Sequence, residues 1–116
     1  MSEVTIYHNP RCSKSRATLA LLEEHGVAPR VVEYLSTPPD AATLKRLLDL
    51  LGLSPRELMR RKETAYSNLG LDDDTLGNDA LIEAMIANPI LIERPIVVAG
   101  EKAVIGRPPE NVLALI

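Results

Sequence analysis

The 116-residue chain contains one cysteine, Cys12, so it cannot form a disulfide bond within itself. Any redox cycle that uses this thiol must therefore take a second thiol from another molecule. A single unpaired cysteine is more typical of a reducing compartment than of a secreted, disulfide-linked scaffold. The sequence also lacks the basic region and following apolar run of a signal peptide. We therefore expect a cytoplasmic protein.

The chain has no Phe or Trp and only three Tyr, and its formal net charge is −3. This charge argues against a nucleic-acid-binding protein, and the scarcity of aromatic side chains argues against single-strand binding through base stacking. No apolar stretch approaches the roughly 18–20 residues that span a membrane. We expect one compact domain over residues 1–116, with neither a nucleic-acid nor a membrane partner.

The signatures of several other active sites are also absent from the sequence. His8 and His25 stand too far from other ligand residues to suggest zinc, and we expect no metal. No Gly-rich phosphate-binding loop of the P-loop type occurs. A cysteine phosphatase would need arginine six residues after its cysteine, and Thr18 occupies that position.

Hydrophobic periodicity and turn residues predict an α/β protein. Residues 4–7 and 30–34 are typical of strands, and a helix over residues 13–25 would join them into a parallel βαβ unit. A β-hairpin is expected over residues 96–99 and 102–105. A final short helix is expected to begin near Pro108 or Pro109 and to reach Leu115.

Three helices are expected between these two parts of the chain. The first carries an apolar stripe at helical spacing, and the second begins at a capping box and reaches about residue 60 or 61. The third is capped by Asn78 and ends at Asn88-Pro89. The stripe is formed by Leu44, Leu47, Leu48 and Leu51, and the capping box by Ser54 to Glu57.

The resulting order, βαβ followed by helices and then ββα, is that of a thioredoxin-like fold with a helical insertion at about residues 40–89. We expect a mixed four-stranded sheet flanked by helices. In this plan Cys12 lies where the first strand gives way to the first helix, and the loop before the hairpin comes near it. That loop contains Arg94-Pro95, and its position is compatible with a cis peptide bond.

Cys12 has surroundings that suit a reactive thiol. Free backbone N–H groups and the positive end of the dipole at a helix N-terminus favour anions, and cationic neighbours favour a thiolate. Arg11, Lys14 and Arg16 supply positive charge nearby. The alternative is a small buried apolar residue, which is how free cysteines most often behave. The polar neighbours favour the reactive thiol.

Two further side chains belong to this segment. Ser15 stands where a C-x-x-C motif has its second cysteine, so a resolving thiol is absent and its hydroxyl is a candidate donor to the thiolate. Ser15 is alternatively an ordinary polar residue in a first helical turn. His8, when protonated, would stabilise the thiolate, or it is a strand-end histidine that bonds to the backbone.

Three arginines outside the cysteine loop are candidates for binding an oxyanion. Arg60 lies at the end of a predicted helix, whereas Arg94 and Arg107 flank one end of the hairpin. Guanidinium groups bind oxyanions in a bidentate manner that lysine does not reproduce. Each arginine taken alone is better explained by a helix terminus or a solvated loop. The shared end of the hairpin favours convergence of Arg94 and Arg107 on Cys12.

Several segments together resemble the glutaredoxin-dependent arsenate reductases. The active-site segment of that family resembles Tyr7-His8-Asn9-Pro10, Cys12 and Ser15-Arg16. Further matches follow in order along nearly the full chain: Leu58-Met59-Arg60, Tyr66, Leu69-Gly70-Leu71, Asn88-Pro89-Ile90-Leu91-Ile92, Arg94-Pro95-Ile96-Val97-Val98 and Gly106-Arg107-Pro108.

The resemblance implies an arsenate reductase that contributes to arsenic resistance. It implies that Cys12 is the nucleophile, that His8 helps to ionise it, and that Arg60, Arg94 and Arg107 bind the oxyanion. Arsenate would form an adduct with Cys12, and glutathione would then reduce it to arsenite. Glutaredoxin would restore the enzyme. Glutathione is then a co-substrate, and no tightly bound cofactor is expected.

Two other functions remain open for this scaffold. One is a monothiol glutathione-dependent oxidoreductase or transferase that acts on another substrate. The other is a non-enzymatic Spx-type regulator that docks on RNA polymerase. Many such regulators carry a C-x-x-C switch, which Ser15 removes here.

Overall fold

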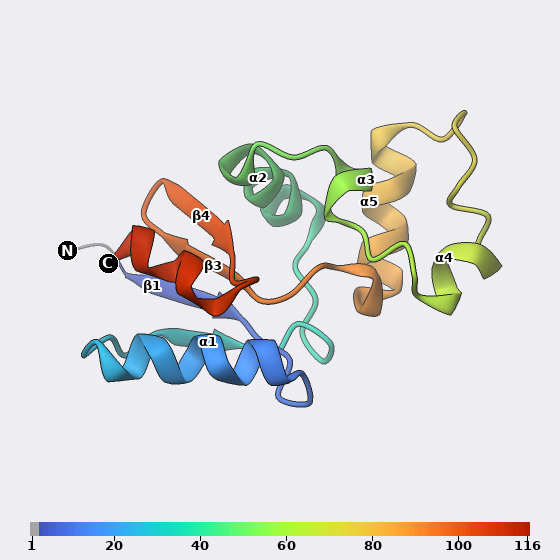
Figure 1. Ribbon diagram of the computed structural model, residues 1–116. Helices are drawn as coiled ribbons and strands as arrows, with labels where there is room; N and C mark the ends of the chain where they lie inside the picture. Colours follow the sequence, from blue (N-terminus) through green and yellow to red (C-terminus); the bar gives the residue numbers. More distant parts are fainter. Residues whose placement is uncertain (1–2) are drawn as a thin grey trace. The chain divides into compact units, whose positions relative to one another are not determined.

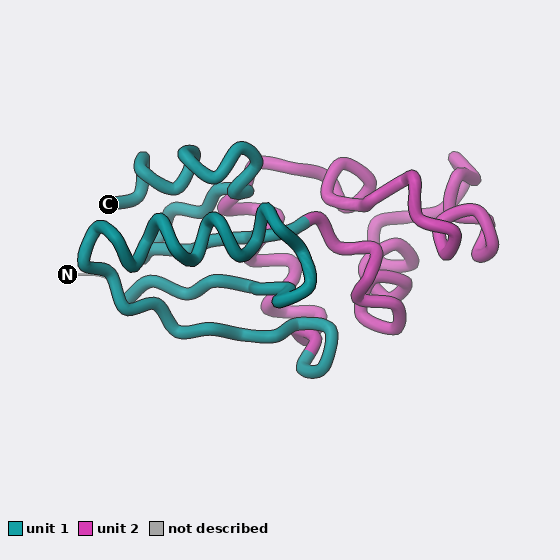
Figure 2. The backbone as a smooth tube through the Cα atoms, turned by 60° about the horizontal axis from the view of Figure 1, so that its bottom comes forward, with its two compact units in different colours: residues 1–37, 94–116 teal, residues 38–93 magenta. Residues whose placement is uncertain are grey.

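The computed structural model describes residues 3–116 and shows a chain divided into two compact units (Figure 1, Figure 2). Unit 1 comprises residues 1–37 and 94–116, and unit 2 comprises residues 38–93. Unit 2 corresponds to the helical insertion expected at about residues 40–89. The expectation of one domain over the whole chain stays a prediction.

A mixed four-stranded sheet, in the order β2-β1-β3-β4, forms the centre of unit 1. Strand β1 (Val4–Tyr7) pairs in parallel with β2 (Arg30–Val32). On its other side β1 pairs antiparallel with β3 (Ile96–Ala99), which pairs antiparallel with β4 (Lys102–Ile105). The sheet and the hairpin predicted from the sequence are therefore confirmed.

Helix α1 (Ser13–Glu24) and the 3-10 helix η2 (Pro109–Leu115) pack against each other in unit 1. The core residues that they share with the sheet are fully buried. These residues are Ile6, Leu22, Val97 and Val112. Because β1 leads into α1 through a short loop, the packing fixes the helix N-terminus close to the end of β1 (Figure 1).

Two elements of unit 1 differ from the prediction. Strand β2 ends at Val32, two residues before the expected end, because the chain turns at Glu33. The carbonyl of Glu33 accepts hydrogen bonds from the N–H groups of Ser36 at 3.0 Å and Thr37 at 2.9 Å. The last helix is a 3-10 helix and not an α-helix.

Unit 2 is helical, and none of the helices formed by residues 3–116 combines the length and apolarity needed to cross a membrane. In unit 2, α2 and α3 each pack against α5, which also contacts η1. The elements are α2 (Ala41–Leu51), α3 (Pro55–Leu58), α4 (Thr64–Asn68), α5 (Asn78–Ala87) and the 3-10 helix η1 (Pro89–Leu91).

Local signals in the sequence determine the starts of α2 and α3. The Asp40 side chain accepts a hydrogen bond from the Thr43 N–H at 2.8 Å and thereby caps α2. The predicted capping box is present at α3, where Ser54 and Glu57 each bind the other's backbone N–H. Gly52 ends α2 in the left-handed conformation, with φ of 69°.

The expected end of α3 and the expected N-cap of α5 are wrong. Helix α3 stops at Leu58, not at residue 60 or 61, because the chain beyond it pairs with residues 91–93. The Arg60 N–H donates to the Leu91 carbonyl at 2.7 Å, and the Glu93 N–H donates to the Leu58 carbonyl at 2.9 Å. Helix α5 has Gly77 at its N-cap, so Asn78 is its first residue and not its cap.

Candidate active site

Cys12 occupies the N-cap position of α1, with an extended backbone at φ of −93° and ψ of 123°. Its N–H donates to the Asn9 carbonyl at 3.0 Å, and its carbonyl accepts the Arg16 N–H at 3.0 Å. The intervening N–H groups of Ser13, Lys14 and Ser15 have no acceptor within the helix. They form an anion-binding end at the residue that carries the thiol. Cys12 itself is 8% exposed.

Arg107 brings a permanent positive charge to this thiol from the segment that follows β4. Its Nη2 lies 3.6 Å from the Cys12 Sγ, and its Nε donates to the Arg94 carbonyl at 2.7 Å. The two contacts hold the planar guanidinium between two distant parts of unit 1. The structure therefore brings together Cys12 and Arg107, as the position of the hairpin predicted.

Arg94 contributes its main-chain carbonyl to this arrangement. The peptide bonds Arg94–Pro95 and Arg107–Pro108 are both cis. The Gly106 N–H donates to the Pro95 carbonyl at 2.9 Å, so the two segments are hydrogen-bonded beside the guanidinium of Arg107. The Nε and Nη1 atoms of the Arg94 side chain are buried. A role for that side chain in holding an oxyanion stays a prediction.

His8 and Ser15 form a buried polar pair behind the cysteine loop. The Nδ1 of His8 lies 2.6 Å from the Ser15 Oγ, which also accepts the Asn9 N–H at 3.0 Å. Ser15 is fully buried, and His8 is 6% exposed. Among the described residues the Ser15 hydroxyl has these two partners and makes no hydrogen bond to Cys12. The predicted donation from Ser15 to the thiolate is therefore not part of this structure.

Burial changes the protonation of His8. Removal of the ring from water lowers the pKa of His8, while the charge of Glu33 raises it and that of Arg16 lowers it by smaller amounts. The neutral imidazole is thus the favoured form at neutral pH. The expectation that a protonated His8 stabilises the thiolate runs against this shift, and a role of His8 in ionising Cys12 stays a prediction.

Arg60 belongs to unit 2, where two acidic side chains surround it. Its Nη1 lies 2.6 Å from the Glu63 carboxylate, and its Nε lies 3.8 Å from that of Glu93. Because α3 ends at Leu58, Arg60 lies beyond the helix and not in its last turn. Its predicted role in binding the oxyanion stays a prediction.

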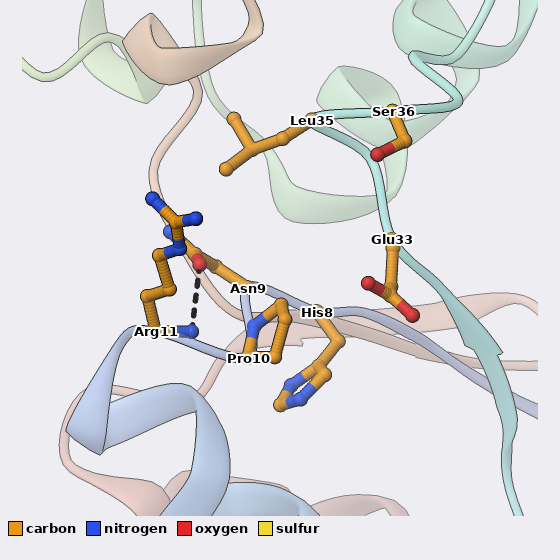
Figure 3. Close-up of a pocket in the computed structure, with 7 residues that line it drawn as sticks. All are labelled: His8, Asn9, Pro10, Arg11, Glu33, Leu35 and Ser36. Carbon is orange, nitrogen blue, oxygen red and sulfur yellow. Dashed lines mark hydrogen bonds between the residues drawn. The ribbon is translucent and has the colours of Figure 1, made fainter.

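A cavity of about 380 Å³ lies against the loop that leads to Cys12 (Figure 3). The end of β1 and its following loop form one wall, and the turn after β2 forms the other. Its lining residues are His8, Asn9, Pro10, Arg11, Glu33, Leu35 and Ser36. The second wall is not predictable from the sequence pattern, which places residues 33 and 34 in a strand. Within residues 3–116 no three His, Cys, Asp or Glu side chains form a group that would hold a metal.

Comparison with known proteins gives consistent matches. The family model described as "ArsC family" matches residues 7–115. The chain is 64% identical over 115 residues to the "Uncharacterized protein YfgD" of Escherichia coli, covering 98% of this chain and 97% of that protein. It is 56% identical over 117 residues to an arsenate reductase of Neisseria meningitidis, with both chains fully covered.

Solved structures agree with these sequence matches. An arsenate reductase from Vibrio cholerae superposes with a TM-score of 0.96 and 55% identity, covering 99% of this chain and 98% of that one. The expected α/β, thioredoxin-like fold class is therefore confirmed.

Proposed function

The chain belongs to the ArsC family, and on that premise we propose that it is an oxidoreductase that reduces arsenate to arsenite. The relatives named arsenate reductase support the substrate, since one of them is 56% identical over the full chain. The observation that carries the chemistry is the 3.6 Å distance between the Arg107 Nη2 and the sulfur of the single cysteine. A nucleophilic thiol next to a guanidinium suits an oxyanion substrate.

In the first step the Cys12 thiolate attacks the arsenic atom of arsenate. A sulfur–arsenic bond forms, one arsenic–oxygen bond breaks, and the oxygen leaves as water after it takes up protons. Arg107 pairs with the anionic oxygens, and the N–H groups at the start of α1 add further donors. Arg94 and Arg60 are proposed to supply the remaining positive charge that holds the oxyanion.

In the second step a glutathione thiolate attacks the Cys12 sulfur of the adduct, and a sulfur–sulfur bond forms as the sulfur–arsenic bond breaks. The electron pair of the sulfur–arsenic bond passes to arsenic, which changes from As(V) to As(III) and leaves as arsenite. Cys12 remains in a mixed disulfide with glutathione. Because Cys12 is the only cysteine, no internal thiol can resolve this disulfide. The thiol that releases Cys12 from this disulfide must therefore come from another molecule.

Glutaredoxin and a second glutathione then release Cys12. The glutathionyl group passes to the glutaredoxin thiol and from there to glutathione, which yields glutathione disulfide. Overall, two thiols lose two electrons and one arsenate gains them, so the cycle balances. The protein carries out this cycle without a tightly bound cofactor and, on the argument of the single cysteine, in the cytoplasm.

The buried pair behind the loop has a supporting role in this scheme. Ser15 ties the α1 N-terminus to His8 and to the Asn9 N–H, which fixes the loop that presents the thiol. His8, with a lowered pKa, acts mainly as a neutral hydrogen-bonding partner at neutral pH. We propose that its help in ionising Cys12 is that of a neutral proton acceptor.

A coupled assay tests the proposal. Purified protein is mixed with arsenate, glutathione, glutaredoxin, glutathione reductase and NADPH, and the oxidation of NADPH is followed. We expect arsenate-dependent turnover that falls to background in Cys12→Ser and persists in the exposed control Ser67→Ala. Absence of arsenate-dependent turnover in the wild type would refute the proposal. Glutathionylation of Cys12 without arsenate turnover would instead favour a glutathione-dependent oxidoreductase with another substrate.

A further inference from the structure

We infer that the cavity between the cysteine loop and the turn after β2 binds the tripeptide thiol co-substrate through its charged ends. This inference rests on the proposed function, because it assigns a site to the glutathione of that reaction. The cavity is distinct from the oxyanion-binding end of α1. Arg11 and Glu33 are the residues that would recognise the ligand, with Pro10 and Leu35 on the walls beside its apolar part.

The position of the cavity places a ligand near the nucleophile. Pro10 and Arg11 line it, and Cys12 is the next residue in the chain. Consecutive Cα atoms are about 3.8 Å apart, whereas an extended tripeptide spans roughly 10 Å. A tripeptide held at Arg11 can therefore extend its central cysteine toward Cys12. The cavity volume of about 380 Å³ also lies in the range typical of small-molecule sites.

The charges of the cavity suit a ligand that carries both signs. Arg11 and Glu33 lie on opposite sides of the hollow in Figure 3. Glutathione has carboxylates and one ammonium group, so Arg11 would pair with a carboxylate and Glu33 with the ammonium. The Glu33 carboxylate repels an isolated oxyanion such as arsenate. These charges therefore favour the thiol co-substrate over the oxyanion at this place.

The cavity also has exposed apolar residues that suit the apolar part of glutathione. Leu35 is 39% exposed, and its side chain extends from the turn after β2 toward the guanidinium of Arg11 (Figure 3). Pro10 is exposed on the wall that leads to Cys12. The methylene groups of a γ-glutamyl side chain would cover both residues and remove their apolar surface from water. Apolar side chains together with a few placed charged groups are the usual composition of a small-molecule site.

Binding is tested with S-methylglutathione, a probe that keeps the charged ends but has no thiol. Amide NMR shifts of the wild-type chain should change saturably at His8, Arg11, Leu35 and Ser36. Glu33→Gln and Arg11→Gln should each raise the dissociation constant about two- to five-fold, since both groups are exposed and their ion pairs are correspondingly weak. The matched control Glu101→Gln, on the hairpin turn, should bind as the wild type does.

A second probe identifies the partner of Glu33. An S-methylglutathione analogue without the ammonium group should bind the wild type more weakly, and Glu33→Gln should lose this preference. In the coupled assay, Glu33→Gln should raise the KM for glutathione and leave the KM for arsenate unchanged. This split between the two KM values would not follow from a general loss of structure.

Either of two results would overturn the inference. One is the absence of saturable shifts at the cavity residues with millimolar probe, and the other is equal affinity of Glu33→Gln and Glu101→Gln. Probe binding and arsenate turnover together distinguish a failure of the cavity proposal from a failure of the proposed function. Probe binding without arsenate turnover would refute the proposed function and leave the cavity as a glutathione site. Arsenate turnover without probe binding would refute the cavity alone.

Discussion

The guanidinium of Arg107 lies 3.6 Å from the sulfur of Cys12, although 95 residues separate them in the sequence. The same guanidinium donates through Nε to the carbonyl of Arg94 at 2.7 Å. The second contact fixes the plane of the group and directs Nη2 at the sulfur. The positive charge at the thiol is thus held in place by the backbone of the segment that precedes β3.

Arg107→Lys tests whether this fixed geometry matters beyond its charge. Lysine keeps the charge but cannot donate to the Arg94 carbonyl and the Cys12 sulfur from one rigid plane. We expect kcat/KM for arsenate to fall about 10- to 100-fold, the equivalent of one charge-assisted hydrogen bond. The matched variant Arg30→Lys, at an exposed position on β2, should retain wild-type kinetics. Equal activity of Arg107→Lys and Arg30→Lys would show that charge alone suffices.

Ser15→Ala tests the buried pair behind the loop. Loss of the hydroxyl leaves the Asn9 N–H and the His8 Nδ1 without their partner in a buried place. We expect the free energy of unfolding in urea to fall by about 1–3 kcal/mol. Ser13→Ala, at an exposed position in the same helical turn, should change it by less than about 0.5 kcal/mol. Similar values for the two variants would contradict the importance of the pair.

The lowered pKa of His8 predicts a pH dependence of stability. Between its folded pKa and its unfolded value of about 6.5, the unfolded chain binds more protons than the folded one. The contribution of His8 to the free energy of unfolding should therefore be fully present above pH 6.5. The free energy of unfolding should decrease as the pH falls below that value. His8→Asn should flatten this part of the curve, measured by urea unfolding at several pH values. An unchanged slope in the variant would argue that His8 does not cause it.

Gly106→Ala tests the close approach between α1 and the segment that carries Arg107. A Cβ at residue 106 would lie 2.7 Å from the Thr18 Oγ1 and 2.9 Å from the Pro95 ring, so the neighbours must shift. We expect a loss of stability of about 1–3 kcal/mol. Gly77→Ala is the matched control, because a Cβ there meets no atom within 4 Å. Thr18→Ala should partly restore stability in the double variant, and strict additivity would contradict a steric cause.

Arg56→Lys tests a group of three hydrogen bonds that one guanidinium donates within unit 2. The Nη1 of Arg56 donates to the Tyr66 hydroxyl at 2.8 Å and to the Leu71 carbonyl, while Nη2 donates to the Asp73 carbonyl at 3.1 Å. Lysine cannot make all three bonds from one plane. We expect faster hydrogen exchange over residues 64–73 in this variant than in the exposed control Arg61→Lys. Equal exchange in the two variants would contradict a stabilising role of these three hydrogen bonds.

Features that depend on neighbouring residues were predictable from the sequence. The β-hairpin was correctly located because runs of β-branched residues flank Gly100-Glu101, and α2 because Leu44 begins an apolar stripe. The end of α3 was not predictable, because it depends on pairing with residues 91–93. Helix α4 has only five residues and no apolar period of its own.

In the candidate site, too, only the features that depend on neighbouring residues were predictable. The position of Cys12 at a helix N-terminus follows from the adjacent strand and helix, and it was predicted. The contact between His8 and Ser15 depends on how the loop folds back onto the first turn of α1, and the sequence suggested a different partner for Ser15. The cavity wall at Glu33 depends on where β2 ends, which periodicity located two residues too late.

The most direct measurement of the central claim is the mass of the Cys12 peptide after the protein reacts with arsenate and glutathione in the absence of glutaredoxin. We predict a glutathionyl adduct on Cys12 that accumulates only when arsenate is present, because the mixed disulfide forms as arsenite leaves. A Cys12 peptide that stays unmodified, or that is modified equally with and without arsenate, would contradict the account.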